Sequence, residues 1–367
     1  MRPTGFFPFI SVLFGLPVAS VFSDEPPKED LRVWHDVSEW GVEGQGWAPE
    51  VMTSRYDRLP AKAEGVVREA VWNLSRHSAG ISFRFDTDST EISIRYKLGS
   101  PSLGMTNMAP TGKSGIDLYA FHESEWKWVD VTRPKSQDGD HIIKGLNPGM
   151  RSYLAYLPLY NSTTSVEIGV LPEALIEPVA PRPEKPVVFY GTSITHGASA
   201  SRPGMAHVAI LGRRLDIPIV NLGFSGNGRM EPEVGALVAE VDAAVYVIDC
   251  LPNMNGDSVA ERAEPLVRQI RSIRPETPII LVEDRTFTNA WIFKARRERH
   301  LENRASLIRA YDNLVSSGVK SLYYLEGDQL LGEDTEGTTD GSHPSDLGFL
   351  RQADAFEPIL KEALGLD

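Results

Sequence analysis

The sequence predicts a two-part protein, in which a β-rich section precedes an α/β section built on a parallel sheet. Between about residues 30 and 180, apolar and polar side chains alternate with the period of a strand. From residue 187 onward, short apolar runs alternate with stretches of three- and four-residue spacing. Prolines concentrate between these regions, at 171–186. These patterns indicate a β-sandwich followed by a parallel sheet with helices on both faces.

Length and composition restrict the possible functions. The chain has 367 residues, enough for two domains, with 41% hydrophobic and 24% charged residues. Its formal net charge is −13, which repels polyphosphates and anionic lipid. The densest basic run, 296–299, is interpreted as the solvated start of a helix. We therefore expect no nucleic-acid partner, and the sequence leaves the oligomeric state open.

Residues 1–23 have the pattern of a secretory signal peptide. Arg2 supplies the positive end, the stretch 6–21 is apolar, and cleavage could follow 18–20 or 21–23. An uncleaved N-terminal anchor is the alternative. No later segment is long and apolar enough to span a bilayer. We expect a secreted or periplasmic protein with no membrane span after signal removal.

The β-rich section is expected to be a sandwich or jelly roll at 30–175. Residues 81–86 and 91–96 both alternate, and the turn between them predicts that they pair as a hairpin. Further strands are predicted at 126–131, 153–160 and 165–170. Many short strands with little helix are typical of a sandwich.

Two features of this section could serve either structure or binding. In the string 114–119, Gly115 suits a bend, and Asp117 follows in a strand where it can hydrogen-bond the backbone, or else bind a ligand. Trp126 and Trp128 are two residues apart and so share one strand face. They could stack on a sugar or pack in the core.

The proline-rich stretch 171–186 is predicted to be a semi-rigid linker to a second domain at 185–367. Strands are expected there at 187–190, 217–222, 243–248, 278–282 and 321–325. Helices are expected at 203–216, 230–241, 258–274, 296–317 and 346–365. In such sheets, sites form from the loops at the carboxyl ends of the strands.

Those loops carry the groups that serine hydrolysis requires. The loops are 191–197, 223–228, 249–255, 283–291 and 328–344. Ser193 offers a nucleophile, the glycine-rich second loop offers free N–H groups, and Asn253 offers an amide. Asp340 and His343 are three residues apart, close enough for one turn to hold a base and its orienting carboxylate. The fourth loop could shape substrate access or simply pack.

Other chemistries fit less well. The spacing of the glycines matches neither a phosphate loop nor a dinucleotide fingerprint. A helix N-cap would explain Ser193 alone but not the residues at other strand ends. Cys250 ends an apolar run and is expected to be a buried thiol. Metal-ligand spacing is absent from His196, His207, His300 and His343, and His196 is interpreted as a loop histidine. We expect no cofactor and no metal.

These residues resemble the SGNH (GDSL-like) hydrolase family over roughly 185–365. Ser193 stands in Gly-Thr-Ser, with Thr192 where the family commonly has Asp. Gly226 and Asn253 match the second and third blocks, and the last block matches Asp340 and His343. The Gly-x-Asp-Leu-Tyr string resembles an N-terminal domain that precedes some SGNH-type esterases.

The resemblance implies a flavodoxin-like three-layer α/β/α domain, preceded by a jelly-roll-like sandwich of the GxDLY type. It implies that Ser193 attacks, His343 acts as base and Asp340 orients it. The oxyanion would be held by the N–H groups of Ser193 and Gly226 and by the side chain of Asn253.

The sequence therefore predicts a secreted serine esterase that removes a small acyl group, acetyl in the first instance, from carbohydrate. Its partner would be an acylated small molecule or polysaccharide. The alternatives are a secreted glycan-binding protein without catalysis, and an acyltransferase using the same triad.

Overall fold

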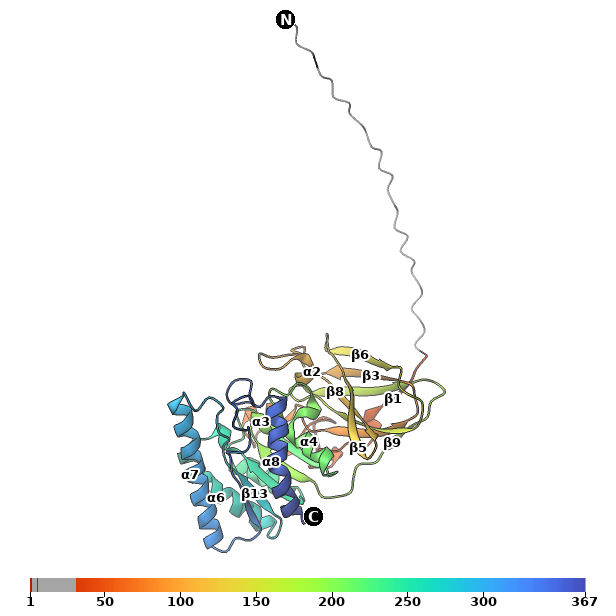
Figure 1. Cartoon of the computed structure of the whole chain (residues 1–367). Coiled ribbons are helices and arrows are strands. Elements are labelled where there is room, and N and C mark those ends of the chain that lie inside the picture. Colours follow the sequence, from red (N-terminus) through yellow and green to blue (C-terminus); the bar gives the residue numbers. More distant parts are fainter. Residues whose placement is uncertain (2–4, 6–30, 367) are drawn as a thin grey trace. The chain divides into compact units, whose positions relative to one another are not determined.

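The computed structural model describes residues 1, 5 and 31–366, and the chain from Arg32 onward forms one compact unit (Figure 1). The expected signal peptide at 1–23 lies outside the described residues, apart from Met1 and Gly5. Within the part that is described, no helix is long and apolar enough to cross a membrane.

The first part of this unit is a sandwich of two antiparallel sheets, as predicted. One sheet has the order β1-β8-β3-β6, formed by Val33–Asp36, Thr163–Val170, Glu91–Leu98 and Asp138–Lys144. The other has the order β5-β4-β7-β2-β9, formed by Glu125–Val131, Asp117–His122, Arg151–Tyr156, Ser82–Thr87 and Ile176–Val179. Their facing apolar side chains make one buried core. We call β1 to β9 the sandwich section.

The predicted hairpin between 81–86 and 91–96 is wrong, because β2 and β3 lie in opposite sheets. β2 pairs with β7 and β9, whereas β3 pairs with β6 and β8. The connection is an arch held by buried side chains, in which Ser89 Oγ donates to Glu91 O at 2.5 Å and Thr87 Oγ1 donates to the Leu175 carbonyl at 2.6 Å. Alternation shows that one face of a strand is buried. Because strands of both sheets in a sandwich bury one face, alternation does not show which sheet a strand joins.

The proline-rich linker contributes a strand that the sequence did not predict. Ile176–Val179 pairs with β2 at the edge of its sheet. Pro178 has no N–H to donate, which an edge strand tolerates because one of its sides has no neighbouring strand. Short helices also interrupt the sandwich section: α1 Glu69–Ser75 and α2 Pro110–Lys113, with 3-10 turns η1 Val37–Glu39, η2 Pro49–Val51 and η3 Ala61–Ala63.

The second part, which we call the parallel section, is a five-stranded parallel sheet of order β11-β10-β12-β13-β14. Its strands are β10 Val187–Gly191, β11 Ile219–Gly223, β12 Val245–Asp249, β13 Ile279–Val282 and β14 Leu322–Leu325. All five predicted strands are present. This order is that of flavodoxin-like sheets. In them the second strand is added on one side of the first, and all later strands are added on the other side.

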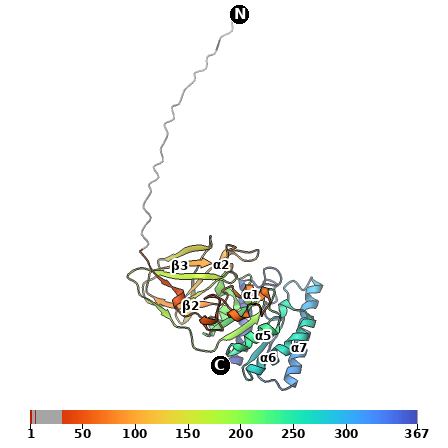
Figure 2. The same cartoon turned by 180° about the vertical axis from the view of Figure 1, so that it is seen from behind.

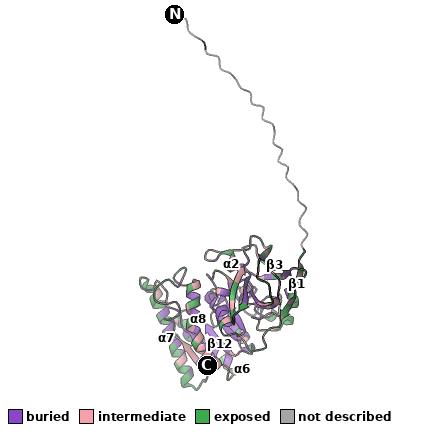
Figure 3. Ribbon diagram, turned by 45° about the vertical axis from the view of Figure 1, so that its right-hand side comes forward, coloured by how far each residue is buried: buried purple, intermediate pink, exposed green. Residues whose placement is uncertain are grey.

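Helices cover both faces of this sheet, which makes the predicted three layers (Figure 1 and Figure 2). The helices are α3 Ser193–His196, α4 His207–Arg214, α5 Pro232–Glu240, α6 Gly256–Ile273, α7 Lys294–Ser316 and α8 Asp346–Leu364, with 3-10 turns η4 Pro203–Met205 and η5 Leu251–Asn253. Side chains of α5, α6 and α7 join one buried cluster, and those of α4 and α8 join another. The buried residues concentrate along the sheet between these helices (Figure 3).

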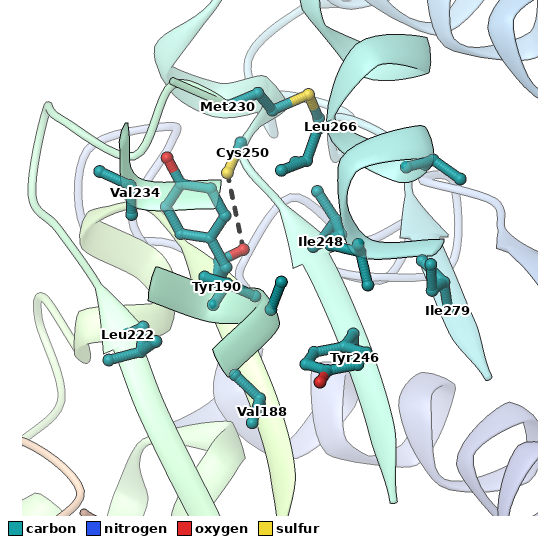
Figure 4. Packing of buried hydrophobic residues seen from close by; sticks show 14 of the residues in the cluster. Val188, Tyr190, Leu222, Met230, Val234, Tyr246, Ile248, Cys250, Leu266 and Ile279 are labelled. Atoms are coloured by element: carbon teal, nitrogen blue, oxygen red, sulfur yellow. Dashed lines mark hydrogen bonds between the residues drawn. The ribbon is translucent and has the colours of Figure 1, made fainter. Parts of the chain in front are cut away.

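Strand β10 illustrates why a continuous apolar run predicts a strand with helices on both faces of its sheet: its alternate side chains are buried on opposite faces. Val188 and Tyr190 belong to one cluster, and Val187 and Phe189 belong to the other. Cys250 lies next to this strand, and its Sγ lies 3.6 Å from the Tyr190 carbonyl oxygen (Figure 4). Burial raises the pKa of this thiol well above its ordinary value, as expected for a buried cysteine at a strand end.

Candidate active site

Ser193 is the first residue of α3, the single helical turn that follows β10. Thr192 is the N-cap, and its Oγ1 accepts a hydrogen bond from the Ile194 N–H at 3.3 Å. The turn ends at Gly197, whose φ of 103° suits glycine. Because Thr192 does the capping, Ser193 is left with its hydroxyl available. Thr192 thus has a defined structural role in the place where the family commonly has Asp.

Two glycines let this turn pack directly against the neighbouring strands. A Cβ on Gly191 would collide with Thr195 Oγ1, and a Cβ on Gly223 would collide with the backbone of His196. Thr195 in turn donates from Oγ1 to Asp249 Oδ2 at 3.0 Å. The ends of β10, β11 and β12 are therefore locked together around the nucleophile turn.

His343 connects Ser193 to Asp340. Its Nε2 lies 2.9 Å from Ser193 Oγ, and its Nδ1 lies 2.7 Å from Asp340 Oδ2. The second oxygen of Asp340 accepts from the N–H groups of Ser342 and His343 at 2.9 and 2.8 Å. If Nδ1 carries the proton that it donates to Asp340, Nε2 is the acceptor for the serine hydroxyl.

The electrostatics of Asp340 favour its charged form. Burial raises the pKa of its carboxyl, but hydrogen bonds from His343 and Ser342 together outweigh this effect and lower it. Asp340 therefore supplies a negative charge beside His343. The structure brings these predicted residues together as one hydrogen-bonded chain.

Gly226 and Asn253 lie on adjoining loops beside the nucleophile turn. Gly226 has a φ of +69°, and its N–H makes no hydrogen bond within the described residues. When the Asn253 amide is oriented so that its oxygen accepts from the Asn227 and Gly228 N–H groups, at 3.1 and 3.2 Å, its Nδ2 is available to donate. Phe224 N donates to Gly191 O at 3.0 Å, which places this loop against the residues just before Ser193.

The sandwich section also contacts the nucleophile turn, through residues that the sequence did not point to. Tyr160 Oη donates to the Ser193 carbonyl oxygen at 3.2 Å. The Tyr160 ring stacks on His196 with centroids 4.0 Å apart, and His196 Nε2 donates to Leu159 O at 2.7 Å. Burial and the neighbouring Arg58 lower the pKa of His196 well below its ordinary value. His196 is therefore a neutral buried residue of α3 rather than a loop histidine.

Arg58 is a second residue of the sandwich section that contacts the parallel section near the site, and its side chain is fully buried. It donates to the carbonyl oxygens of Leu74 at 2.6 Å and His77 at 2.9 Å in its own section. It also donates to Asn221 O at 3.0 Å and Gly223 O at 2.7 Å, at the end of β11. Burial lowers the pKa of Arg58 to about 9. No periodicity or motif marks this arginine in the sequence.

The loop predicted at 283–291 supports the segment that carries Asp340 and His343. Arg285 is buried, pairs with Asp284, and donates to the Oγ of Ser342. Arg296, just after the loop, donates to Asp340 O at 3.2 Å. Much of this loop is thus packed behind the site, whereas Trp291 near its end is 73% exposed.

Asp249 does not join the Ser193–His343 chain among the described contacts. Its carboxylate is buried and accepts from Thr195. Burial raises the pKa of Asp249 to about 7, and the hydrogen bond from Thr195 and the charge of Arg285 offset part of this effect. The contacts assign Asp249 to holding β10 and β12 together.

Asp117 of the Gly-x-Asp-Leu-Tyr string has a structural set of partners. It is fully buried and accepts from Trp128 Nε1 at 2.9 Å, from Arg202 Nη1 at 2.9 Å and from Gly204 N at 2.8 Å. Trp126 packs edge-on against Phe121, with ring centroids 5.2 Å apart. Asp117 and Trp128 therefore join the sandwich section to the η4 region of the parallel section.

Comparisons with known proteins agree with this architecture. Residues 184–361 match the GDSL-like lipase/acylhydrolase family, and residues 32–176 match the N-terminal domain of SGNH hydrolase-type esterases, the GxDLY domain. Among curated proteins, no match was found.

Solved structures give the same picture. A GDSL-like lipase from Bacteroides ovatus is 31% identical, with a TM-score of 0.87, and the alignment covers 92% of this chain and 99% of that one. A salicylyl-acyltransferase from a tetracycline biosynthetic pathway is 18% identical, with a TM-score of 0.69 and coverage of 92% and 98%. A family two carbohydrate esterase from Clostridium thermocellum is 15% identical, with a TM-score of 0.53 and coverage of 78% and 93%.

The fold and the family matches define a hydrolase of ester bonds. The chain belongs to the GDSL-like lipase/acylhydrolase family, with a GxDLY-type N-terminal domain.

Proposed function

We propose that this enzyme is a serine esterase that removes short acyl groups, acetyl in particular, from carbohydrate. The observation that carries the proposal is the chain of contacts from Ser193 Oγ to His343 Nε2, at 2.9 Å, and from His343 Nδ1 to Asp340 Oδ2, at 2.7 Å. These distances are within hydrogen-bond reach, as a nucleophile, its base and the orienting carboxylate require.

In this mechanism, Ser193 Oγ attacks the ester carbonyl carbon while His343 Nε2 takes the hydroxyl proton. The tetrahedral intermediate collapses, and His343 returns the proton to the leaving alcohol, which leaves an acyl group on Ser193. Water, deprotonated by the same nitrogen, then releases the carboxylic acid and restores the serine. Asp340 holds the imidazole in orientation and stabilises its charged form.

The negative charge that develops on the ester oxygen needs fixed donors. The N–H groups of Ser193 and Gly226 make no hydrogen bond within the described residues, and Asn253 has Nδ2 available. We assign these groups to the oxyanion hole. Each such donor contributes roughly 10²–10³ in turnover in other hydrolases.

The surroundings of the site support a bulky polar alcohol as leaving group. A depression of 1080 Å³ is lined by residues 104–110 of the sandwich section together with Thr339 and Asp340. Its position next to Asp340 offers room for a sugar residue. The fold shared with carbohydrate esterases is consistent with this substrate class. Secretion, and the domain boundaries 30–175 and 185–367, belong to the same proposal and rest on the sequence pattern.

Hydrolysis of an aryl acetate by the purified protein tests the mechanism. Ser193→Ala should reduce kcat by roughly 10⁴ or more while the protein stays folded. Ser272→Ala, which changes an exposed serine on α6, should leave kcat unchanged. Equal turnover by the Ser193→Ala variant and the wild type would rule out this nucleophile.

Acetylated polysaccharides test the substrate class. The wild type should release acetate from them, as measured enzymatically in the supernatant. Binding to the polysaccharide without release of acetate would favour a glycan-binding protein. Transfer of the acetyl group to an added alcohol in preference to water would favour an acyltransferase.

A further inference from the structure

A second depression, of 390 Å³, adjoins Asn253 and is rich in arginine. It is lined by Asn253 together with Arg229, Arg262 and Arg299. Arg229 follows the loop of Gly226, Arg262 is on α6, and Arg299 is on α7. Side chains from three separate segments thus converge beside the proposed oxyanion donors.

Hydrogen bonds to the backbone hold all three guanidinium groups in place, since Arg262 Nη1 donates to Arg229 O at 3.2 Å. Arg229 Nε donates to Gly226 O at 2.9 Å. Arg299 Nη2 donates to Pro252 O at 2.7 Å and to Met254 O at 3.3 Å. Each bond uses one donor nitrogen of a group that has several, so the remaining donors stay available to a ligand.

These arginines keep most of their charge uncompensated. Within the described part of the chain, neither Arg229 nor Arg299 lies within ion-pair distance of a carboxylate, and Arg262 has only Glu261, at 3.9 Å. The whole chain carries a formal net charge of −13, so a cluster of three arginines, two of them without an ion-pair partner among the described residues, departs from the average surface. The depression on the Asp340 side contrasts with it, since no basic residue lines that one.

Resting on the proposed esterase function, we infer that the preferred substrate is an acylated carbohydrate that carries an anionic group. The planar guanidinium forms paired hydrogen bonds with carboxylate, sulfate or phosphate oxygens. The ester oxygen sits at the N–H of Gly226, and Arg229 is bonded to the carbonyl of that same residue. Because the depression adjoins Asn253 and Arg229 contacts Gly226, we place the anionic group on the same sugar residue as the ester or on the next one.

A set of three acetylated methyl glycosides tests this inference: a glucuronoside, a glucoside 6-sulfate and a neutral glucoside. For the wild type, kcat/KM should be about tenfold or more higher for at least one anionic substrate than for the neutral one. The preferred anion distinguishes a carboxylate from a sulfate ligand. Raising the salt concentration should reduce the preference, because salt screens exposed charges.

Variants locate the effect. The double change Arg229→Gln and Arg299→Gln should bring the ratio of anionic to neutral kcat/KM to within about threefold of one, if the pair supplies most of that tenfold preference. Arg297→Gln removes an exposed arginine of α7 that does not line the depression, and should leave the ratio unchanged. Arg229→Lys and Arg299→Lys keep the charge and should retain part of the preference.

The inference and the proposed function fail in different ways. If the wild type hydrolyses all three substrates equally, the anionic preference is overturned and the esterase function stands. An equal loss on all substrates in the double variant would assign the arginines to the scaffold, which also overturns the inference. If neither these esters nor an aryl acetate is hydrolysed, the proposed function is overturned and this inference with it.

Discussion

The hydroxyl of Tyr160 donates a hydrogen bond to the carbonyl oxygen of Ser193 at 3.2 Å, across the boundary between the sandwich and parallel sections. Burial raises the pKa of the Tyr160 hydroxyl. A hydrogen bond with the side chain of Ser225, in the loop of Gly226, offsets part of this rise. One phenol from the sandwich section thus contacts both the nucleophile turn and the loop assigned to the oxyanion.

Removing this hydroxyl should slow catalysis without weakening substrate binding. Tyr160→Phe keeps the ring stacked on His196 but loses both hydrogen bonds, at a cost of about 1 kcal/mol in the free energy of unfolding. We expect kcat to fall about tenfold or more, with KM little changed, because small displacements of reacting groups are costly. Steady-state kinetics and urea unfolding measure both effects. Tyr323→Phe is the control, and an unchanged kcat in Tyr160→Phe would refute the positioning role.

Loss of the amide of Asn253 should affect the transition state most. In Asn253→Ala one oxyanion donor is gone, and the N–H groups of Asn227 and Gly228 lose an acceptor. We expect kcat on an aryl acetate to fall by roughly 10²–10³. A rise in KM alone, at constant kcat, would instead show that Asn253 serves ground-state binding.

Asp249 predicts a pH dependence of stability. Burial raises the pKa of this carboxyl from 3.8 to about 7. Between these pH values the unfolded chain releases a proton that the folded protein keeps, so this group makes the wild type less stable as pH rises. Asp249→Asn lacks that proton, so its free energy of unfolding relative to the wild type should rise by up to about 4 kcal/mol from pH 4 to pH 8. Urea unfolding at several pH values measures the difference, and a flat difference contradicts the prediction.

Asp117 should matter for stability rather than for chemistry. Asp117→Asn leaves the guanidinium of Arg202 without its carboxylate and weakens the contacts to Trp128 and Gly204. Breaking a buried ion pair in this way costs about 3 kcal/mol. Asp138→Asn changes an exposed carboxylate of β6 and should stay within about 0.5 kcal/mol of the wild type. Equal unfolding midpoints for the two variants would show that the buried pair contributes nothing.

The sequence allowed the parallel section to be predicted well, since strands buried on both faces are continuous apolar runs. Placing Ser193, Asn253 and Asp340 at strand ends then needed only the rule for parallel sheets. Whether the residues assigned to the site act as assigned stays a prediction. The pairing of β2 with β3 was predicted wrongly, because alternation does not say to which sheet of a sandwich a strand belongs.

Contacts between the two sections left no trace in the sequence. Tyr160 ends a stretch predicted as a strand, and Arg58 stands in the mixed polar and apolar stretch 54–61, which has no recognisable pattern. Their contacts across the section boundary are made with partners at least 33 residues away, such as Ser193 for Tyr160 and Asn221 for Arg58. A local pattern reports which face of an element is buried, but it does not report which distant carbonyl a side chain will meet.

Arg58 also bears on how such a chain can evolve. Its buried guanidinium donates to four carbonyl oxygens, two from each section, and its Nη2 also lies 3.5 Å from His196 Nε2. If either section were replaced by an unrelated domain, a desolvated cation would lose half of its acceptors, which is costly for any buried charge. We therefore expect selection against recombination that separates the sections, and inheritance of the pair as one unit. We therefore regard the two sections as parts of one structural unit, rather than as a catalytic domain with an exchangeable N-terminal domain.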